Sequence, residues 1–180
     1  LLNSTHPMLP DTEKLAEKLR EEYKVPVIPI SIEAMQERDM YNILKEAHSG
    51  VAYLALLLLL IAAINGIAGL VSKRNFTATD RKIGLFALIF THIQLLVGII
   101  LYFVSPKVQS MGIAMKDAEM RLYALEHPLI NVLAIVLITI GWSKHKKMAE
   151  GNAKFKPFAI FYTIGLILIL SRIPWNTWFA

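Results

Sequence analysis

The amino-acid sequence predicts an all-α membrane protein: an antiparallel four-helix transmembrane bundle preceded by a small α/β-like N-terminal extension. The first observation is composition, because 55% of the 180 residues are hydrophobic and the mean hydropathy is +0.48, which is unlike a water-facing domain. The second is a set of four long apolar segments. The third is charge, since residues 1–47 carry six Lys or Arg against nine Asp or Glu, whereas residues 48–180 carry thirteen against five. We therefore expect an extension, 1–39, and a membrane domain, 40–180.

The extension has the pattern of a β–loop–α–β–α fragment. Residues 11–23 place apolar side chains at helical spacing, and Asp11 or Thr12 is a suitable N-cap because its side-chain oxygen accepts from free N–H groups of the first turn. Residues 24–30 are β-branched and interrupted by proline, which favours a short strand. Residues 36–47 favour a second helix. A piece of this size is too small to bury a core of its own.

The segments LLNSTHP, EEYKVPVIPI and MQERDMYNILKEA occur in this order within residues 1–47. They resemble the late part of the GTPase-like domain of the stage IV sporulation protein A family, which assembles on the forespore surface using ATP. The family's phosphate-binding loop, GxxxxGK[ST], does not occur in the sequence, so we expect no nucleotide cofactor. Residues 1–39 are then either a foreign fragment, joined by fusion or by a mis-joined reading frame, or an acidic extension on the membrane surface. Met40 would serve as an initiator for the remainder, and no signal-peptide pattern precedes it.

Four apolar segments have the length of membrane spans. The clearest, 83–104, contains no charged residue and, at about 1.5 Å per residue, is about 33 Å long, enough to cross a hydrocarbon core of about 30 Å. The predicted spans are about 51–72, 83–104, 123–142 and 158–174. Short connections after the first and third favour antiparallel neighbours and hence the bundle. Glycines that predict close helix approach are Gly66, Gly69, Gly98, Gly141 and Gly165.

The distribution of basic residues among the loops predicts an orientation. The loops after the first and third spans carry nine Lys or Arg, whereas the loop after the second carries three. The positive-inside rule then places both basic loops in the cytoplasm and both termini outside, in a bacterial inner membrane. Anionic lipid explains the basic character, so the expected partner is the bilayer. Without interleaved aromatic and basic residues, we expect no nucleic acid.

Three histidines lie in or beside the spans: His48, His92 and His127. The chain has no cysteine, and two imidazoles from facing helices can hold a haem iron in a helix bundle. At about 1.5 Å per residue from the cytoplasmic ends, His92 lies about 14 Å up, His127 about 24 Å and His48 about 36 Å, so no two are level. Tilt or a helix break would bring His48 and His127 together, and His92 with His127 is the next pair.

Each histidine also has a structural interpretation, a hydrogen bond to a neighbouring helix; for His92 this is a polar clasp that holds the second span in the bundle. His145 lies in a lysine run and is expected to be solvated. Arg172, near the outer end of the fourth span, has three possible roles: it snorkels to the interface, pairs with Glu126, or neutralises a haem propionate. Asn65 and Asn131 are expected to form interhelical hydrogen bonds.

The segments MYNILKEAHSGVAYLALLLLLIAAINGIAGLV, THIQLLVGIILYFVSP and LYALEHPL resemble a family of small four-span bacterial membrane proteins labelled "cytochrome B". The resemblance covers nearly all of residues 40–180. It implies a b-type-haem-like membrane bundle that exchanges electrons with quinone, with His48, His92 and His127 on the family's histidine positions.

The leading functional expectation is an integral membrane haem-b electron-transfer protein, with His48 and His127 as axial ligands. Arg172 would lie near a propionate, and His92 would be an alternative ligand or a proton-handling group. The alternative is a haem-free structural or accessory subunit of a larger membrane complex, such as a respiratory complex. The sequence contains no hydrolytic or transferase motif, so any catalytic role is that of an electron-transfer subunit.

Overall fold

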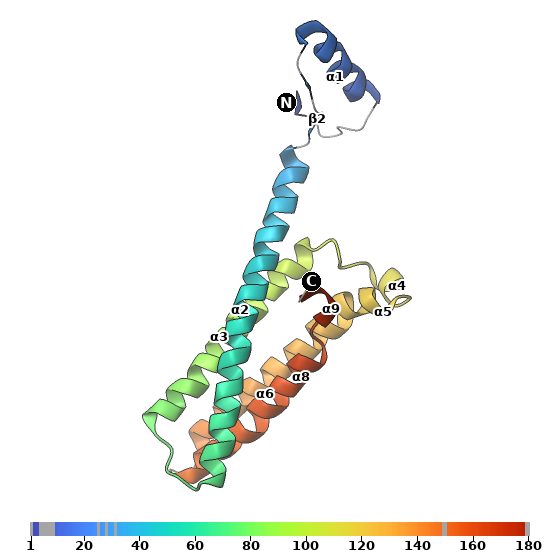
Figure 1. The fold of residues 1–180 in the computed structure, drawn as a ribbon. Coiled ribbons are helices and arrows are strands. Elements are labelled where there is room, and N and C mark those ends of the chain that lie inside the picture. Colours follow the sequence, from blue (N-terminus) through green and yellow to red (C-terminus); the bar gives the residue numbers. More distant parts are fainter. Residues whose placement is uncertain are drawn as a thin grey trace. The chain divides into compact units, whose positions relative to one another are not determined.

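The computed structural model describes residues 2–3, 10–24, 26–27, 29–30, 32–148 and 151–178. The chain divides into two compact units, Leu1–Ile43 and Leu44–Ala180, and each is considered by itself. Across the described residues the chain is mainly helical (Figure 1). The predicted helical class is confirmed at this level.

The N-terminal unit contains one complete helix and a pair of very short strands. Its elements are β1 (Leu2–Asn3), α1 (Pro10–Tyr23), β2 (Pro29–Ile30) and the start of α2 (Ile32–Val71). The two strands pair in parallel, with Leu2 opposite Pro29. Proline suits the first turn of α1, because a backbone N–H at that position has no acceptor within the helix and its absence costs no hydrogen bond. Arg20, in the last turn of α1, donates from Nε to the carbonyl of Val27 at 2.9 Å. This bond holds the segment that follows α1 against the helix.

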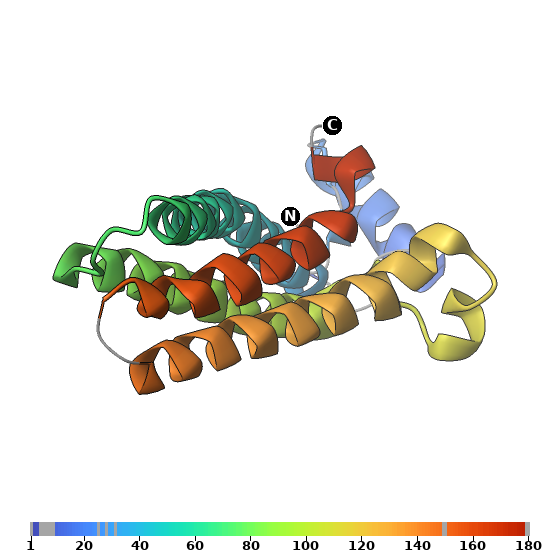
Figure 2. The same cartoon turned by 90° about the horizontal axis from the view of Figure 1, so that it is seen from below.

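The larger unit continues through α2 into three further long helical segments. Its elements after α2 are α3 (Ala78–Val104), α4 (Met111–Ala114), α5 (Ala118–Arg121), η1 (Leu122–Glu126), α6 (His127–Lys147), η2 (Asn152–Lys154), α7 (Phe155–Pro157), η3 (Phe158–Tyr162), α8 (Thr163–Ser171) and α9 (Trp175–Trp178). Two of these, η1 and η3, are π-helical turns inside otherwise α-helical segments. Successive long helices run in opposite directions (Figure 1) and lie side by side (Figure 2).

Four helical segments are long and apolar enough to cross a membrane, as predicted. They are Arg38–Val71, Ala78–Val104, Ala118–Lys147 and Asn152–Ser171. Each helical segment begins before the corresponding predicted span, and the third segment also ends after its predicted span. The reason is that the polar turns beside the apolar sequence are helical too. Before α3, for example, Thr77 and Asp80 form a reciprocal capping box, which satisfies N–H groups that would otherwise have no partner.

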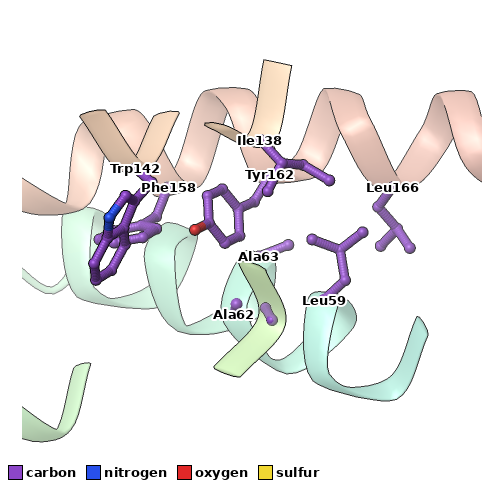
Figure 3. Close-up of a cluster of buried hydrophobic side chains, with 9 residues drawn as sticks. Leu59, Ala62, Ala63, Ile138, Trp142, Phe158, Tyr162 and Leu166 are labelled. Carbon is purple, nitrogen blue, oxygen red and sulfur yellow. The ribbon is translucent and has the colours of Figure 1, made fainter. Parts of the chain in front are cut away.

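One buried cluster joins all four long helices (Figure 3). It consists of Leu59, Ala62, Ala63, Ala87, Ile138, Trp142, Phe158, Tyr162 and Leu166. At its centre Tyr162 is fully buried, and its hydroxyl donates to the Gly84 carbonyl at 3.0 Å. A buried hydroxyl needs such a partner, because leaving it without one costs about 1–3 kcal/mol.

Glycine allows the closest helix contacts in this unit. A Cβ added at Gly66 would lie 2.7 Å from the Ala159 backbone nitrogen, and one at Gly165 would lie 2.7 Å from Ile138 Cγ1. At Gly141 it would lie 2.7 Å from Phe161 Cβ. The predicted role of these glycines at close approaches is therefore confirmed.

The buried carboxylate of Asp80 holds together the ends of α2 and α3 and the loop between them. Asp80 is 4% exposed, and Arg74 donates to its two oxygens at 2.7 and 2.8 Å. Asn65 Nδ2 donates to the same carboxylate at 2.9 Å, and Thr77 donates from both its backbone N–H and its hydroxyl. The hydrogen bond to Asp80 raises the pKa of the Arg74 guanidinium. The predicted hydrogen bonding of Asn65 is confirmed, with a charged pair as its partner.

The expectation that His145 is solvated is wrong. Its side chain is 3% exposed, and its ring lies against those of Phe158, Trp142 and Phe76, with centroid distances of 4.8, 5.0 and 5.2 Å. The reason is helix phase: His145 falls on the inward face of α6, one turn beyond Gly141 and Trp142, while the neighbouring lysines face outward. A histidine within a charged run can therefore belong to the core.

Candidate functional site

The imidazole rings of His48 and His127 meet where α2 passes the start of α6. Their ring centroids are 6.3 Å apart, and the ring planes are inclined at 73°. His127 is the first residue of α6 and directly follows the π-helical turn η1. Such turns occur often at functional sites because they displace side chains from the regular helical positions. The structure thus brings together the histidine pair that sequence reasoning favoured.

The straight-helix estimate had put these histidines at different heights. Part of the difference comes from the end of α6, which lies at Lys147 rather than at residue 142. Five more residues at about 1.5 Å each raise the estimate for His127 by about 7.5 Å. Much of the apparent height difference between His48 and His127 therefore came from placing the end of the third span too early.

His127 is oriented by the chain segment that follows α8. Its Nδ1 lies 2.7 Å from the backbone carbonyl of Arg172. Because a carbonyl oxygen only accepts, Nδ1 carries the proton and Nε2 keeps a lone pair. One turn along α6, Asn131 Nδ2 donates to the His127 carbonyl at 2.6 Å. The interhelical bond expected of Asn131 is thus a bond within its own helix.

His48 is held instead against α3. Gln94 Nε2 lies 3.2 Å from each of the two ring nitrogens of His48 and donates to its backbone carbonyl at 2.9 Å. A Cβ at Gly98 would lie 3.0 Å from His48 Cε1, so a glycine makes room for the ring. Gln94 Oε1 is buried and has no hydrogen-bond partner among the described residues. Sequence reasoning did not connect Gln94 with His48.

His92 lies on α3 away from this pair. Its Nδ1 is 2.7 Å from the Leu88 carbonyl of its own helix, and its Nε2 is 3.3 Å from Thr139 Oγ1 on α6. Within the described part of the chain, no ring contact joins His92 to His48 or His127. This geometry corresponds to the polar clasp considered for His92.

Arg172 approaches Glu126, one of the partners considered for it. Arg172 Nε lies 3.3 Å from one carboxylate oxygen of Glu126, and Arg121 Nε lies 2.8 Å from the other. The Arg172 side chain is 48% exposed and that of Glu126 is 31% exposed. Two cations therefore share one carboxylate beside His127, and the local charge is positive.

A small cleft of about 140 Å³ lies beside this charge cluster. It is lined by Glu119, Leu122, Tyr123, Ile173, Pro174, Trp175, Asn176 and Thr177. The hydroxyls of Tyr123 and Thr177 are 2.8 Å apart across it. Ligand pockets usually have volumes of about 300–1,000 Å³, so this cleft is too small for a tetrapyrrole. Sequence reasoning did not find it, because its walls come from η1 and α9, which are distant in sequence.

The donor set at the histidine pair limits which metals it suits. Among the described residues no group of three or more His, Asp or Glu side chains converges as a metal site. Two imidazoles alone suit an iron whose other four ligands come from a porphyrin. The two rings are near enough for one metal ion to lie between them, but because both His48 nitrogens contact Gln94, the His48 ring must turn before it binds a metal.

Comparison with known proteins identifies only the start of the chain. Residues 1–50 match the family model described as "Stage IV sporulation protein A, ATPase domain". Stage IV sporulation protein A of Bacillus anthracis is 49% identical over 47 residues, which are 26% of this chain and 10% of that protein. The protein of the same name from Bacillus subtilis (strain 168) is 40% identical over 47 residues, with the same two shares.

The chain thus spans about a tenth of the length of the curated relatives that it matches. No solved structure matches it. The resemblance predicted for residues 1–47 is confirmed, and that of residues 40–180 to the "cytochrome B" family stays a prediction. The comparisons thus show a short segment similar to the stage IV sporulation protein A ATPase domain, and the structure shows a longer helical part with four candidate membrane spans.

Proposed function

We propose that the chain is an integral membrane protein whose four spans form an antiparallel bundle that binds haem b and transfers electrons. The observation that carries this proposal is the 6.3 Å separation between the ring centroids of His48 and His127. Two imidazoles on opposite sides of one metal ion, each bound at about 2 Å, have ring centres about 6 Å apart. The separation therefore suits a single iron between the rings.

On this proposal Nε2 of His127 would bind the haem iron. The hydrogen bond from its Nδ1–H to the Arg172 carbonyl supports this assignment, because metal-binding histidines commonly donate their other N–H to a carbonyl. A ring nitrogen of His48 would bind the other side of the iron once the ring had turned from Gln94. Bound haem would supply one-electron chemistry, while the chain would hold and orient the group.

Arg172 is the proposed partner of a haem propionate. Glu126 already has a second cation, Arg121, at 2.8 Å, so Arg172 can exchange its 3.3 Å contact with Glu126 for a propionate without leaving that carboxylate unpaired. An arginine pairs well with a carboxylate because its planar N–H groups match the two oxygens.

Quinone is the proposed electron partner. The small cleft supports this, because Trp175 and Pro174 give it apolar walls and the Tyr123 and Thr177 hydroxyls give it polar groups. It accommodates at most part of a quinone headgroup, and its wall residue Ile173 directly follows Arg172, whose carbonyl binds His127. A respiratory membrane complex is the corresponding protein partner.

The absorbance spectrum of the purified full chain, produced with added haem, tests the function. We expect a Soret band and a reduced α-band typical of two axial imidazoles. H48A and H127A should each lose this six-coordinate spectrum, whereas H92A should retain it, because His92 is engaged by Leu88 and Thr139. Circular dichroism of each variant checks the fold. A colourless wild type, or loss of the spectrum in H92A but not in H127A, contradicts the proposal.

The second candidate is a haem-free structural or accessory subunit. One observation favours it: each of the three histidines already contacts, through a ring nitrogen, a part of the chain outside its own helix. These contacts are His48 with Gln94, His92 with Thr139 and His127 with the Arg172 carbonyl. Such bonds hold helices together in lipid without any cofactor. A colourless protein that co-purifies with a larger complex would favour this candidate.

We further propose a bacterial inner membrane as the location, with both basic loops in the cytoplasm and both termini outside. The support is the excess of Lys and Arg in the two loops that follow α2 and α6. Residues 1–39 are then a small extension of α/β-like character outside the membrane. Their similarity to part of the stage IV sporulation protein A ATPase domain supports a foreign origin for this segment.

A further inference from the structure

The two basic loops lie at one end of the larger unit, where Asn152 Nδ2 donates to the Gly69 carbonyl at 2.7 Å. Exposed cations at this end are Lys73, Arg81, Lys82, Lys144, Lys146, Lys147 and Lys156. The carboxylate of Asp80 at the same end is already bound by Arg74. The end therefore attracts anions.

Two of these cations contact the same aromatic ring. The Arg81 guanidinium carbon is 6.0 Å from the Trp142 ring centroid, and Lys146 Nζ is 5.2 Å from it. Arg81 comes from the first turns of α3 and Lys146 from the last turn of α6. Neither forms an ion pair with any described residue. Both cations lie at the same ring, so positive charge is concentrated beside Trp142.

Trp142 itself provides a third donor. Its side chain is 7% exposed, and its indole nitrogen points away from Tyr162 (Figure 3). Within the described residues this N–H has no hydrogen-bond partner. An indole nitrogen only donates, so Trp142 adds a directed N–H to the two cations. Each of these three groups can donate to a phosphate oxygen.

Exposed apolar side chains lie further along both helices. On α3, Phe86 is 50% exposed and Ile89 is 40% exposed. On α6, Ile140 is 36% exposed and Val136 is 49% exposed. A ligand with a phosphate head and hydrocarbon tails would match both parts of this surface. A free phosphate would use only the first part.

We propose that Arg81, Lys146 and the indole N–H of Trp142 bind the phosphate of an anionic phospholipid, whose acyl chains lie on the exposed apolar residues of α3 and α6. Basic sites between transmembrane helices at the cytoplasmic side are suited to such headgroups. The site is separate from the histidine pair, so it does not depend on haem.

Lipid binding to the detergent-purified full chain, measured by native mass spectrometry, tests the site. The probes are phosphatidylglycerol, phosphatidylcholine and inorganic phosphate. R81Q/K146Q should raise the Kd for phosphatidylglycerol by about 100-fold, since each lost charge-assisted hydrogen bond to the phosphate contributes roughly a tenfold factor. K73Q/K82Q, which removes the same charge from exposed positions at the same end, should change the Kd by less than about fivefold. W142F keeps the ring, removes the donor and should weaken binding.

Three results would overturn the site. Equal losses in the two double variants would mean diffuse attraction to a basic surface. Equal affinity for phosphatidylcholine would mean that the lipid's charge is not recognised, and displacement of the lipid by inorganic phosphate at equal concentration would mean that the tails contribute nothing. Thermal unfolding of each variant distinguishes lost binding from lost fold, and R81Q/K146Q alters exposed side chains only.

Discussion

Among single residues, Asp80 has an unusually complete set of partners. Its carboxylate accepts from the Arg74 and Asn65 side chains and from the Thr77 hydroxyl and backbone N–H. A buried charge is tolerated only when it is paired and hydrogen-bonded. Sequence reasoning counted Arg74 among the basic loop residues and did not expect it to be paired. The pattern Thr77-x-x-Asp80 was the signal that could have located the carboxylate, because it is a capping-box spacing.

We predict that D80N lowers the free energy of unfolding by about 1–3 kcal/mol, because the neutral amide cannot accept all the hydrogen bonds that the carboxylate accepts. Thermal unfolding in detergent, with calibration by a chemical denaturant, measures the change. D39N makes the same substitution at an exposed position and should have almost no effect. Equal stability of D80N and the wild type would show that the carboxylate does not stabilise the connection between α2 and α3.

At the scale of elements, α2 packs tightly against η3 and α7 near its C-terminal end. Gly66 faces the backbone of η3 at Ala159 and the side chain of Phe158, and the ring of Phe155 lies over Gly69. In contrast, Gly50 on the same helix has no atom within 4 Å of its added Cβ. The contrast offers a controlled comparison within one helix.

We predict that G66A destabilises the protein by about 1–3 kcal/mol, since the added methyl group meets backbone atoms that cannot move aside easily. G50A should leave stability unchanged or raise it by about 0.5–1 kcal/mol through better helix propensity. The midpoint of thermal unfolding of the two variants gives the comparison. A destabilised G50A together with a neutral G66A would show that α2 packs differently.

At the scale of the whole molecule, composition and hydropathy were sufficient to predict four long apolar helices. The predicted boundaries differ by several residues because capping at Thr77 and the helical run to Lys147 extend the helices through polar sequence. The turns η1 and η3 could not be predicted, since a π-helical turn has no hydrophobic period of its own. Because His127 directly follows η1, the sequence could suggest its contact with His48 but could not fix the geometry of that contact.

The proposed orientation makes a whole-molecule prediction. Because the chain has no cysteine, one introduced thiol is the only target for a maleimide. K116C, in the loop between α3 and α6, should react with a membrane-impermeant maleimide in intact cells. K147C, at the end of α6, should react only after the membrane is permeabilised. The reverse pattern would invert the proposed topology.

Thr91 and His92 have a consequence for how the chain enters a membrane. Thr91 Oγ1 donates to the Leu88 carbonyl at 2.9 Å, and His92 Nδ1 lies 2.7 Å from the same oxygen. Both polar groups thus find partners within α3, before α6 has been synthesised. On the four-span proposal, the second span can leave the insertion machinery for lipid on its own, and the Thr139 contact forms when the third span arrives. The hydrogen bonds within α3 then form first and the bond to α6 forms later, in the order in which the two helices are synthesised.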